Sequence, residues 1–123
     1  MKYDSNCLRG LTYLALAVID LRVTRAVIAS NVLTVTLRWT APANALTTTL
    51  RYSGTLISTA NWNNAVLLSG NLSGAANIFT ATVPYASGTL YFALKTQNSA
   101  GRSPPSNNAF WPQQNVYLPV ILK

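Results

Sequence analysis

Hydrophobic and polar side chains alternate most regularly over residues 90–97. One face of this segment consists of Leu90, Phe92, Leu94 and Thr96. The opposite face consists of Tyr91, Ala93, Lys95 and Gln97. A period of two residues is that of a half-buried strand. The pattern therefore predicts a β-strand that directs Leu90, Phe92 and Leu94 into a hydrophobic core.

A second alternating segment spans residues 32–39, and its apolar face consists of Leu33, Val35, Leu37 and Trp39. Pro42 follows it and cannot donate a ladder hydrogen bond, so the strand ends before that residue. A third segment, residues 47–53, places Tyr52 on the same face as Leu50. These two segments add Leu37, Trp39 and Tyr52 to the predicted core.

Shorter apolar segments follow one another between turn residues. We expect further strands over residues 19–27, 65–69, 78–83 and 107–111, a loose turn over 70–74, and a helical turn capped by Ser58. Asn98, Ser99 and Gly101 end the strand over residues 90–97, and Pro104 and Pro105 prevent a helix from following it. Short strands with turns at regular intervals predict an all-β protein, a sandwich of about seven strands.

Several of these segments together resemble a fibronectin type III domain, particularly the kind found in secreted bacterial proteins. The matching residues are Leu37-Arg38-Trp39-Thr40-Ala41-Pro42, Leu50-Arg51-Tyr52-Ser53, residues 57–62, Tyr91-Phe92-Ala93-Leu94-Lys95-Thr96, and then Asn98, Ala100-Gly101, Ser103 and Ser106-Asn107. The resemblance covers about residues 18–112. It implies a fibronectin type III or immunoglobulin-like β-sandwich with Trp39 between the two sheets.

Two positions depart from the pattern of that family. A tyrosine usually stands near the start of the strand over residues 90–97 and ties it to the upstream loop, but here Leu90 occupies the place. Either packing alone holds this corner, or Tyr85 substitutes for the missing hydroxyl. Thr48 stands where an aromatic residue is common. Both changes reduce the expected core without changing the expected fold.

Both ends of the chain lie outside this domain. Residues 1–17 contain an apolar run from Leu11, too short to span a bilayer, and the triplet Ala15-Leu16-Ala17. They predict either a degenerate signal peptide or an extra strand or ordered leader.

Residues 113–123 are similar to the VYLP-type tails of some secreted bacterial proteins. The apolar members of this tail are Val116, Tyr117, Leu118, Val120, Ile121 and Leu122. The tail is interpreted as an added edge strand, an attachment signal, or a strand that pairs with a neighbouring subunit.

The composition excludes most catalytic chemistry. The chain has no histidine, and Asp4 and Asp20 are its only acidic residues, so no Ser-His triad, His-ligated metal or clustered-carboxylate calcium site is expected. Cys7 stands alone and cannot form an internal disulfide. We therefore predict no enzyme activity, no cofactor and no metal.

Charge is scarce and strongly one-sided. Charged residues make up 9% of the chain, and nine Lys and Arg give a net charge of +7. Such a balance favours an anionic partner, but the cations are spread singly along the sequence, which argues against specific nucleic-acid binding. Aromatic residues expected on the surface offer rings that could stack on sugars, and local packing within the small sandwich is the favoured alternative for each of them. They are Trp62, Tyr85, Tyr91 and Trp111.

Three functions are consistent with these observations. The first is a secreted or cell-surface, non-catalytic structural or interaction module that contacts other protein domains. The second is a self-assembling subunit of an extracellular filament or sheath, in which the terminal segments pair with neighbouring copies. The third is a module that binds polysaccharide or an anionic surface.

Overall fold

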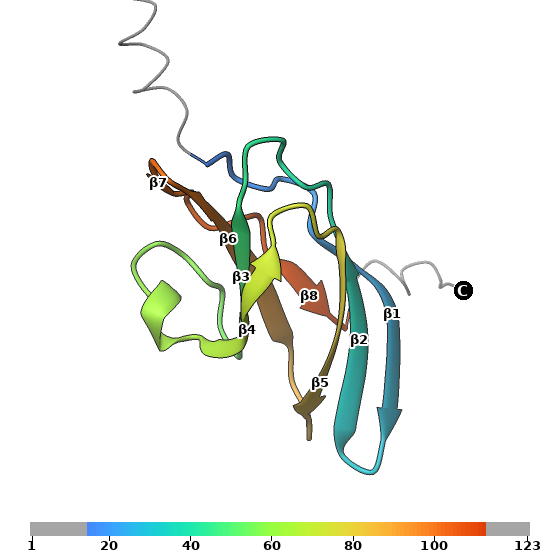
Figure 1. Cartoon of the computed structure of the whole chain (residues 1–123). Helices are drawn as coiled ribbons and strands as arrows, with labels where there is room; N and C mark the ends of the chain where they lie inside the picture. Colours follow the sequence, from blue (N-terminus) through green and yellow to red (C-terminus); the bar gives the residue numbers. More distant parts are fainter. Residues whose placement is uncertain (1–14, 113–123) are drawn as a thin grey trace, which may run out of the picture.

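The computed structural model describes residues 15–112, which form two antiparallel sheets packed face to face (Figure 1). The strands are β1 (Arg22–Ala29), β2 (Val32–Arg38), β3 (Thr47–Ser53), β4 (Val66–Ser73), β5 (Ile78–Pro84), β6 (Leu90–Asn98), β7 (Gly101–Arg102) and β8 (Ala109–Trp111). A short 3-10 helix, η1 (Trp62–Asn64), lies between β3 and β4. The predicted all-β sandwich is therefore confirmed.

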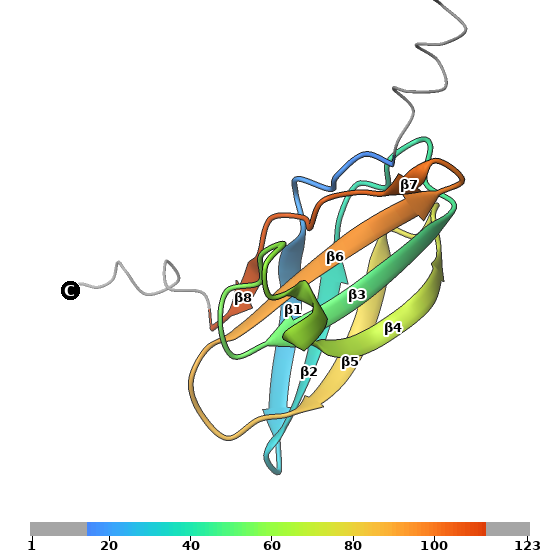
Figure 2. The ribbon, with the colours of Figure 1, turned by 90° about the vertical axis from the view of Figure 1, so that its left-hand side faces the viewer.

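Within this described range, one sheet has three strands in the order β1-β2-β5. The other has five strands: β4, β3 and β6 are neighbours, and β7 and β8 pair with opposite ends of β6. Figure 2 shows the five-stranded sheet in front of the three-stranded one. Ser30 and Asn31 join β1 to β2 with φ angles of 54° and 64°. Positive φ at both turn residues is the geometry of a tight hairpin.

The core lies between the sheets and is formed by the faces that alternation predicts. Five apolar inward residues of β2 and β6 are fully buried, and they are Leu33, Val35, Leu37, Phe92 and Leu94. Trp39 follows β2 and is only 3% exposed. Tyr52 and Leu90 are half-buried and pack against the margin of this core. Thr48 is buried, and its hydroxyl donates to the carbonyl of Ser73.

The expected first strand and the expected turn over residues 70–74 were placed wrongly. The strand begins at Arg22 rather than at residue 19 and continues to Ala29. β4 continues to Ser73, because Thr48 and Thr47 of β3 pair with Leu72 and Ser73. A register shift after Thr48 accommodates one extra residue on β4, so the segment with Gly70 bulges without ending the strand.

Asn61, rather than Ser58, organises the loop before β4. The side-chain carbonyl of Asn61 accepts hydrogen bonds from the backbone N–H of Ser58 at 2.7 Å and from its hydroxyl at 3.3 Å. The Asn61 amide donates to the carbonyl of Leu56 at 2.8 Å. The predicted Ser58 cap is therefore wrong, since the helix that forms is η1 and Asn61 precedes it.

The described part of the predicted leader, residues 15–17, and the residues that follow it up to β1 pack on the sandwich. Ala15, Val18 and Leu21 are each at most 4% exposed. The hydroxyl of Thr96, on β6, donates to the carbonyl of Leu16 at 2.8 Å. These contacts attach the segment before β1 to the five-stranded sheet.

Between β7 and β8, where prolines interrupt strand pairing, two serines make the hydrogen bonds that a partner strand would otherwise make with β6. The N–H groups of Ser103 and Ser106 donate to the carbonyls of Thr96 and Leu94, each at 2.8 Å. In return, the N–H groups of Thr96 and Leu94 donate to the hydroxyl oxygens of Ser103 and Ser106, at 2.9 Å and 3.0 Å. Both serines are buried. The backbone of β6 thus stays satisfied opposite Pro104, which has no N–H to offer.

Adjacent asparagines then connect this strand to two distant segments. The amide of Asn107 exchanges two hydrogen bonds with the backbone of Leu21, both at 2.8 Å. The amide of Asn108 exchanges two with the backbone of Ile57, both at 2.9 Å. Strand pairing resumes only at Ala109, two residues later than predicted.

Candidate interaction surfaces

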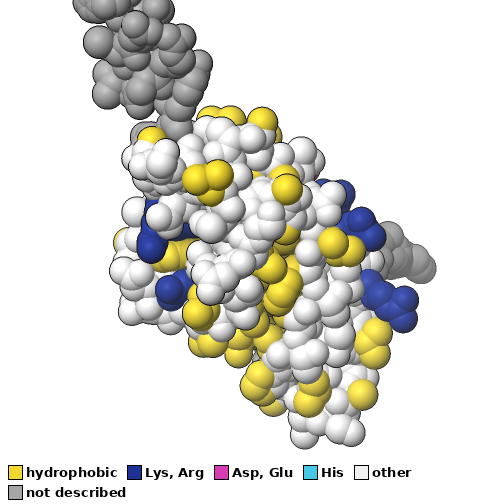
Figure 3. Space-filling model, in the orientation of Figure 1, with side chains coloured by type: hydrophobic (Ala, Val, Ile, Leu, Met, Phe, Trp, Pro, Cys, Tyr) yellow, Lys and Arg dark blue, Asp and Glu magenta, His cyan; other side chains and the backbone are white. Residues whose placement is uncertain are grey.

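The fold gathers the dispersed cations onto two opposite faces. Figure 3 shows basic side chains on the side of β1 and β2 and, separately, on the side of the five-stranded sheet. The arginine face, on the outside of the three-stranded sheet, carries Arg22, Arg25 and Arg38. The lysine face, on the outside of the five-stranded sheet, carries Arg51, Lys95 and Arg102. Cations that are isolated from one another in the sequence are therefore grouped on the surface of the folded domain.

Strand register explains the arginine face. Arg22 of β1 lies opposite Arg38 of β2. Arg25 lies opposite Thr36, which is next to Arg38 on the same face of β2. Directly opposed like charges destabilise a sheet by about 0.2–1 kcal/mol. Asp20 offsets part of this cost, since its carboxylate lies 3.6 Å from the Arg22 guanidinium.

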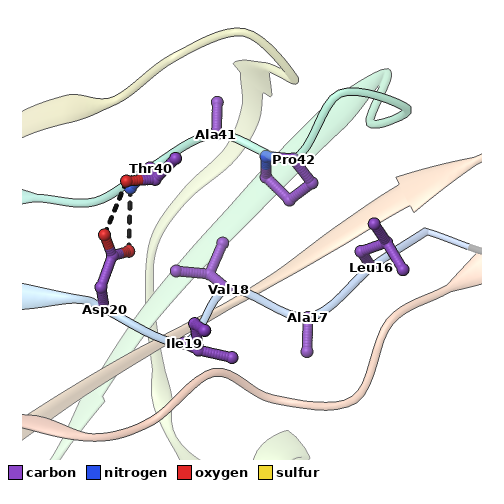
Figure 4. Close-up of a pocket in the computed structure, with 8 residues that line it drawn as sticks. All are labelled: Leu16, Ala17, Val18, Ile19, Asp20, Thr40, Ala41 and Pro42. Carbon is purple, nitrogen blue, oxygen red and sulfur yellow. Dashed lines mark hydrogen bonds between the residues drawn. The ribbon is translucent and has the colours of Figure 1, made fainter.

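The carboxylate of Asp20 is also held by the segment after β2. Its two oxygens accept hydrogen bonds from the backbone N–H of Thr40 at 2.9 Å and from the Thr40 hydroxyl at 2.6 Å (Figure 4). The Thr40 hydroxyl is the main cause that holds the pKa of Asp20 below its usual value, and Arg22 adds to the effect. A hollow of about 320 Å³ lies beside this contact, lined by Leu16, Ala17, Val18, Ile19, Asp20, Thr40, Ala41 and Pro42.

We expect Asp20 to make stability depend on acid pH. Its pKa is lower in the folded than in the unfolded chain, so its stabilising effect is complete above the unfolded pKa of about 4 and is lost as the pH falls through the folded value. Urea unfolding of the wild type and Asp20→Asn, from neutral pH to about pH 2.5, measures this effect. The stability difference between the two proteins should shrink in acid. A difference that stays constant would contradict the assignment.

Trp62 is buried on the outside of the five-stranded sheet, beneath two cations. Its side chain packs with Ile57, Ala65 and Ala93 and is 2% exposed. The Arg51 guanidinium carbon lies 5.2 Å and the Lys95 ammonium nitrogen 4.9 Å from the centre of the indole ring. The expectation that the Trp62 ring is exposed is therefore wrong, because the loop before β4 folds back onto the sheet.

Arg51 and Lys95 are held differently beside this ring. Arg51 Nη1 donates to the carbonyls of Trp62 at 3.4 Å and Ala65 at 3.0 Å, so it fastens the loop. The half-buried Lys95 ammonium makes no hydrogen bond to an acceptor within residues 15–112. Burial, followed by the charges of Arg102 and Arg51, lowers the pKa of Lys95. The alternation over residues 90–97 places Lys95 outward, but no local signal predicts its cationic neighbours.

The other aromatic candidates form pairs and are half-buried rather than exposed. Tyr85 and Trp111 meet edge to face with ring centres 5.3 Å apart, and Tyr91 lies 6.2 Å from Phe110. The Tyr85 hydroxyl donates to the carbonyl of Gly88 at 2.8 Å. This hydrogen bond lies within the turn and does not reach β6, so a replacement by Tyr85 of the hydroxyl missing at Leu90 stays a prediction.

Residues 116–122, predicted to form an interaction segment, lie outside the described residues. Self-assembly by strand pairing requires a sheet edge to which a strand of a neighbouring copy can bind. In the described range, β4 and β5 each pair with one neighbouring strand. Val66 and Leu67 of β4 are 52% and 53% exposed. The interaction role of the tail stays a prediction.

Comparisons with known proteins identify the fold. No family model and no curated protein matches the sequence. Among solved structures, 78% of the chain superposes on domains A168–A170 of titin, with a TM-score of 0.56, 16% identity and coverage of 30% of that chain. An Fn3-like protein from Clostridium thermocellum matches 79% of this chain and 88% of its own, with a TM-score of 0.53 and 16% identity. The chain has a fibronectin type III-like fold.

This fibronectin type III-like fold confirms the predicted fold class. The chain spans under a third of the length of the titin structure, which contains several domains. Within residues 15–112, no helix is long and apolar enough to cross a membrane, and no cluster of three or more His, Cys, Asp or Glu residues could hold a metal ion.

Proposed function

We propose that this chain is a non-catalytic, extracytoplasmic interaction module that binds a negatively charged partner. The observation that carries the proposal is the arrangement of its charges. The arginine and lysine faces hold three cations each, whereas Asp20 is the only carboxylate side chain among residues 15–112. Charge that is not balanced within the folded domain favours association with anions.

The chemistry of the chain supports a role without catalysis. No histidine is present in the sequence. Asp20 is engaged by Thr40 and Arg22, so its carboxylate is committed to structural contacts. A chain that is rich in Thr, Ser and Asn and has only 9% charged residues is consistent with an extracytoplasmic protein. The module would therefore act by binding alone.

Retention on immobilised acidic polymers tests this function. The protein should be retained on heparin and on alginate at low salt and should elute as salt is added, because screening weakens interactions between exposed charges. Neutral dextran, immobilised in the same way, is the control and should not retain it. Equal retention on all three, or none on either acidic polymer at low salt, would refute an anionic partner.

A further inference from the structure

We infer that the lysine face binds an acidic polysaccharide, with Lys95 and Arg102 contacting its carboxylate or sulfate groups. This inference rests on the proposed function and assigns it a surface and a class of ligand. Lys95 and Arg102 lie on β6 and β7, beside the polar side chains of Thr47 and Gln97.

Strand register brings these four residues together. Gln97 of β6 lies between Thr47 of β3 and Arg102 of β7, with which it pairs on either side. Lys95 is two residues before Gln97 and therefore projects from the same face. A groove of about 250 Å³ lies where β3 begins and β6 ends, lined by Leu46, Thr47, Gln97, Asn98 and Ser99. It therefore adjoins Thr47 and Gln97 but is not lined by Lys95 or Arg102.

The charges on this face are held in place before any ligand binds. Trp62 fixes the Lys95 ammonium 4.9 Å from its ring centre, and Gln97 accepts a hydrogen bond from Arg102 Nε at 3.2 Å. Arg102 and Arg51 both act on Lys95 as like charges. An anion placed among them would relieve this repulsion, and a site that is already ordered loses less entropy on binding.

The arginine face is the weaker candidate. Arg22 already has a carboxylate partner, Asp20, at 3.6 Å. Arg25 and Arg38 are exposed, as is Arg102, but the arginine face has no cation as buried as Lys95, which water and salt screen less. No carboxylate within residues 15–112 forms an ion pair on the lysine face.

The polar groups of the lysine face favour a polysaccharide over a nucleic acid. The Thr47 hydroxyl and the Gln97 amide can exchange hydrogen bonds with sugar hydroxyls. Proteins that bind single-stranded nucleic acid also present aromatic rings on which bases stack. The ring that lies beside Arg51 and Lys95 belongs to Trp62, which is buried. Tyr91, further along the same face of β6, is half-buried and packs with Phe110.

The decisive comparison uses two double variants with the same net charge. Lys95→Gln/Arg102→Gln removes the cations of the proposed site, and Arg25→Gln/Arg38→Gln removes two from the opposite face. Binding to alginate oligomers, measured by calorimetry at low salt, should weaken about tenfold or more in the first variant and about twofold or less in the second. Lys95→Arg, which keeps the charge, should bind within about threefold of wild type.

Each outcome of this comparison has a definite meaning. Equal losses in the two double variants, or a larger loss in the arginine-face variant, would overturn the assignment while leaving the proposed function intact. Absence of wild-type binding to any acidic polymer would instead overturn the proposed function itself. Tighter binding to single-stranded DNA than to alginate would refute the polysaccharide class. Should Lys95→Gln/Arg102→Gln fail to fold by circular dichroism, Arg102→Gln alone, which leaves Lys95 on Trp62, must still weaken alginate binding.

Discussion

Replacement of Trp39 with alanine is expected to be the most destabilising single core truncation in this protein and to remove a large share of its free energy of unfolding. Trp39 is 3% exposed and belongs to the cluster of buried residues that both sheets share. Truncation of a buried aromatic side chain costs about 3–5 kcal/mol, whereas small domains are stable by only about 5–15 kcal/mol in total. Urea unfolding monitored by circular dichroism would measure the loss.

Trp111→Ala is the matched control for this variant. Trp111 is half-buried and packs against Tyr85 at the margin of the core, so its truncation should cost less than that of Trp39. Trp39→Phe should also be milder than Trp39→Ala, because it keeps an aromatic ring and because Trp39 Nε1 has no hydrogen-bond partner to lose. A loss in Trp39→Ala no larger than in Trp111→Ala would contradict a central role for Trp39.

The second large effect is expected when both Ser103 and Ser106 are replaced with alanine. Their hydroxyl oxygens accept the N–H groups of Thr96 and Leu94, two residues that are fully buried. Each N–H left without a partner costs about 1–3 kcal/mol, so the double variant should lose about 2–6 kcal/mol. Equilibrium unfolding would measure this loss.

Amide hydrogen exchange would show whether the loss of stability arises at these two N–H groups. The amide protons of Leu94 and Thr96 should exchange faster in the double variant relative to the other protected amides of β6. Ser87→Ala is the control, because Ser87 is exposed in the turn before β6 and its loss should change stability by less than about 0.5 kcal/mol. A double variant as stable as this control would refute the role assigned to the serines.

Local pattern was sufficient to predict the core. A period of two residues distinguishes inward from outward positions without knowledge of the partner strand, so the inward faces of β2 and β6 could be read from residues 32–39 and 90–97. It was not sufficient for β4. Gly70 and Gly74 resemble a turn in sequence, and only the pairing of Leu72 with Thr48 of β3 shows that the strand continues.

The candidate site was harder to predict from the sequence than the core was. Lys95 and Arg102 are seven positions apart and Arg51 lies on another strand, so their common surface depends on register across the sheet. Trp62 was interpreted as exposed because its burial depends on a loop that folds back onto Ala93. Long-range pairing decides both features, and a single sequence contains no direct signal for it.

The neighbouring asparagines Asn107 and Asn108 set a limit on insertions and deletions in this chain. Successive residues of an extended strand face opposite ways, which is how one peptide reaches both Leu21 and Ile57. Adding or removing one residue between β7 and Asn107 would reverse both side chains and break four hydrogen bonds together. The stretch from 103 to 108 must therefore keep its length although it contains no regular strand.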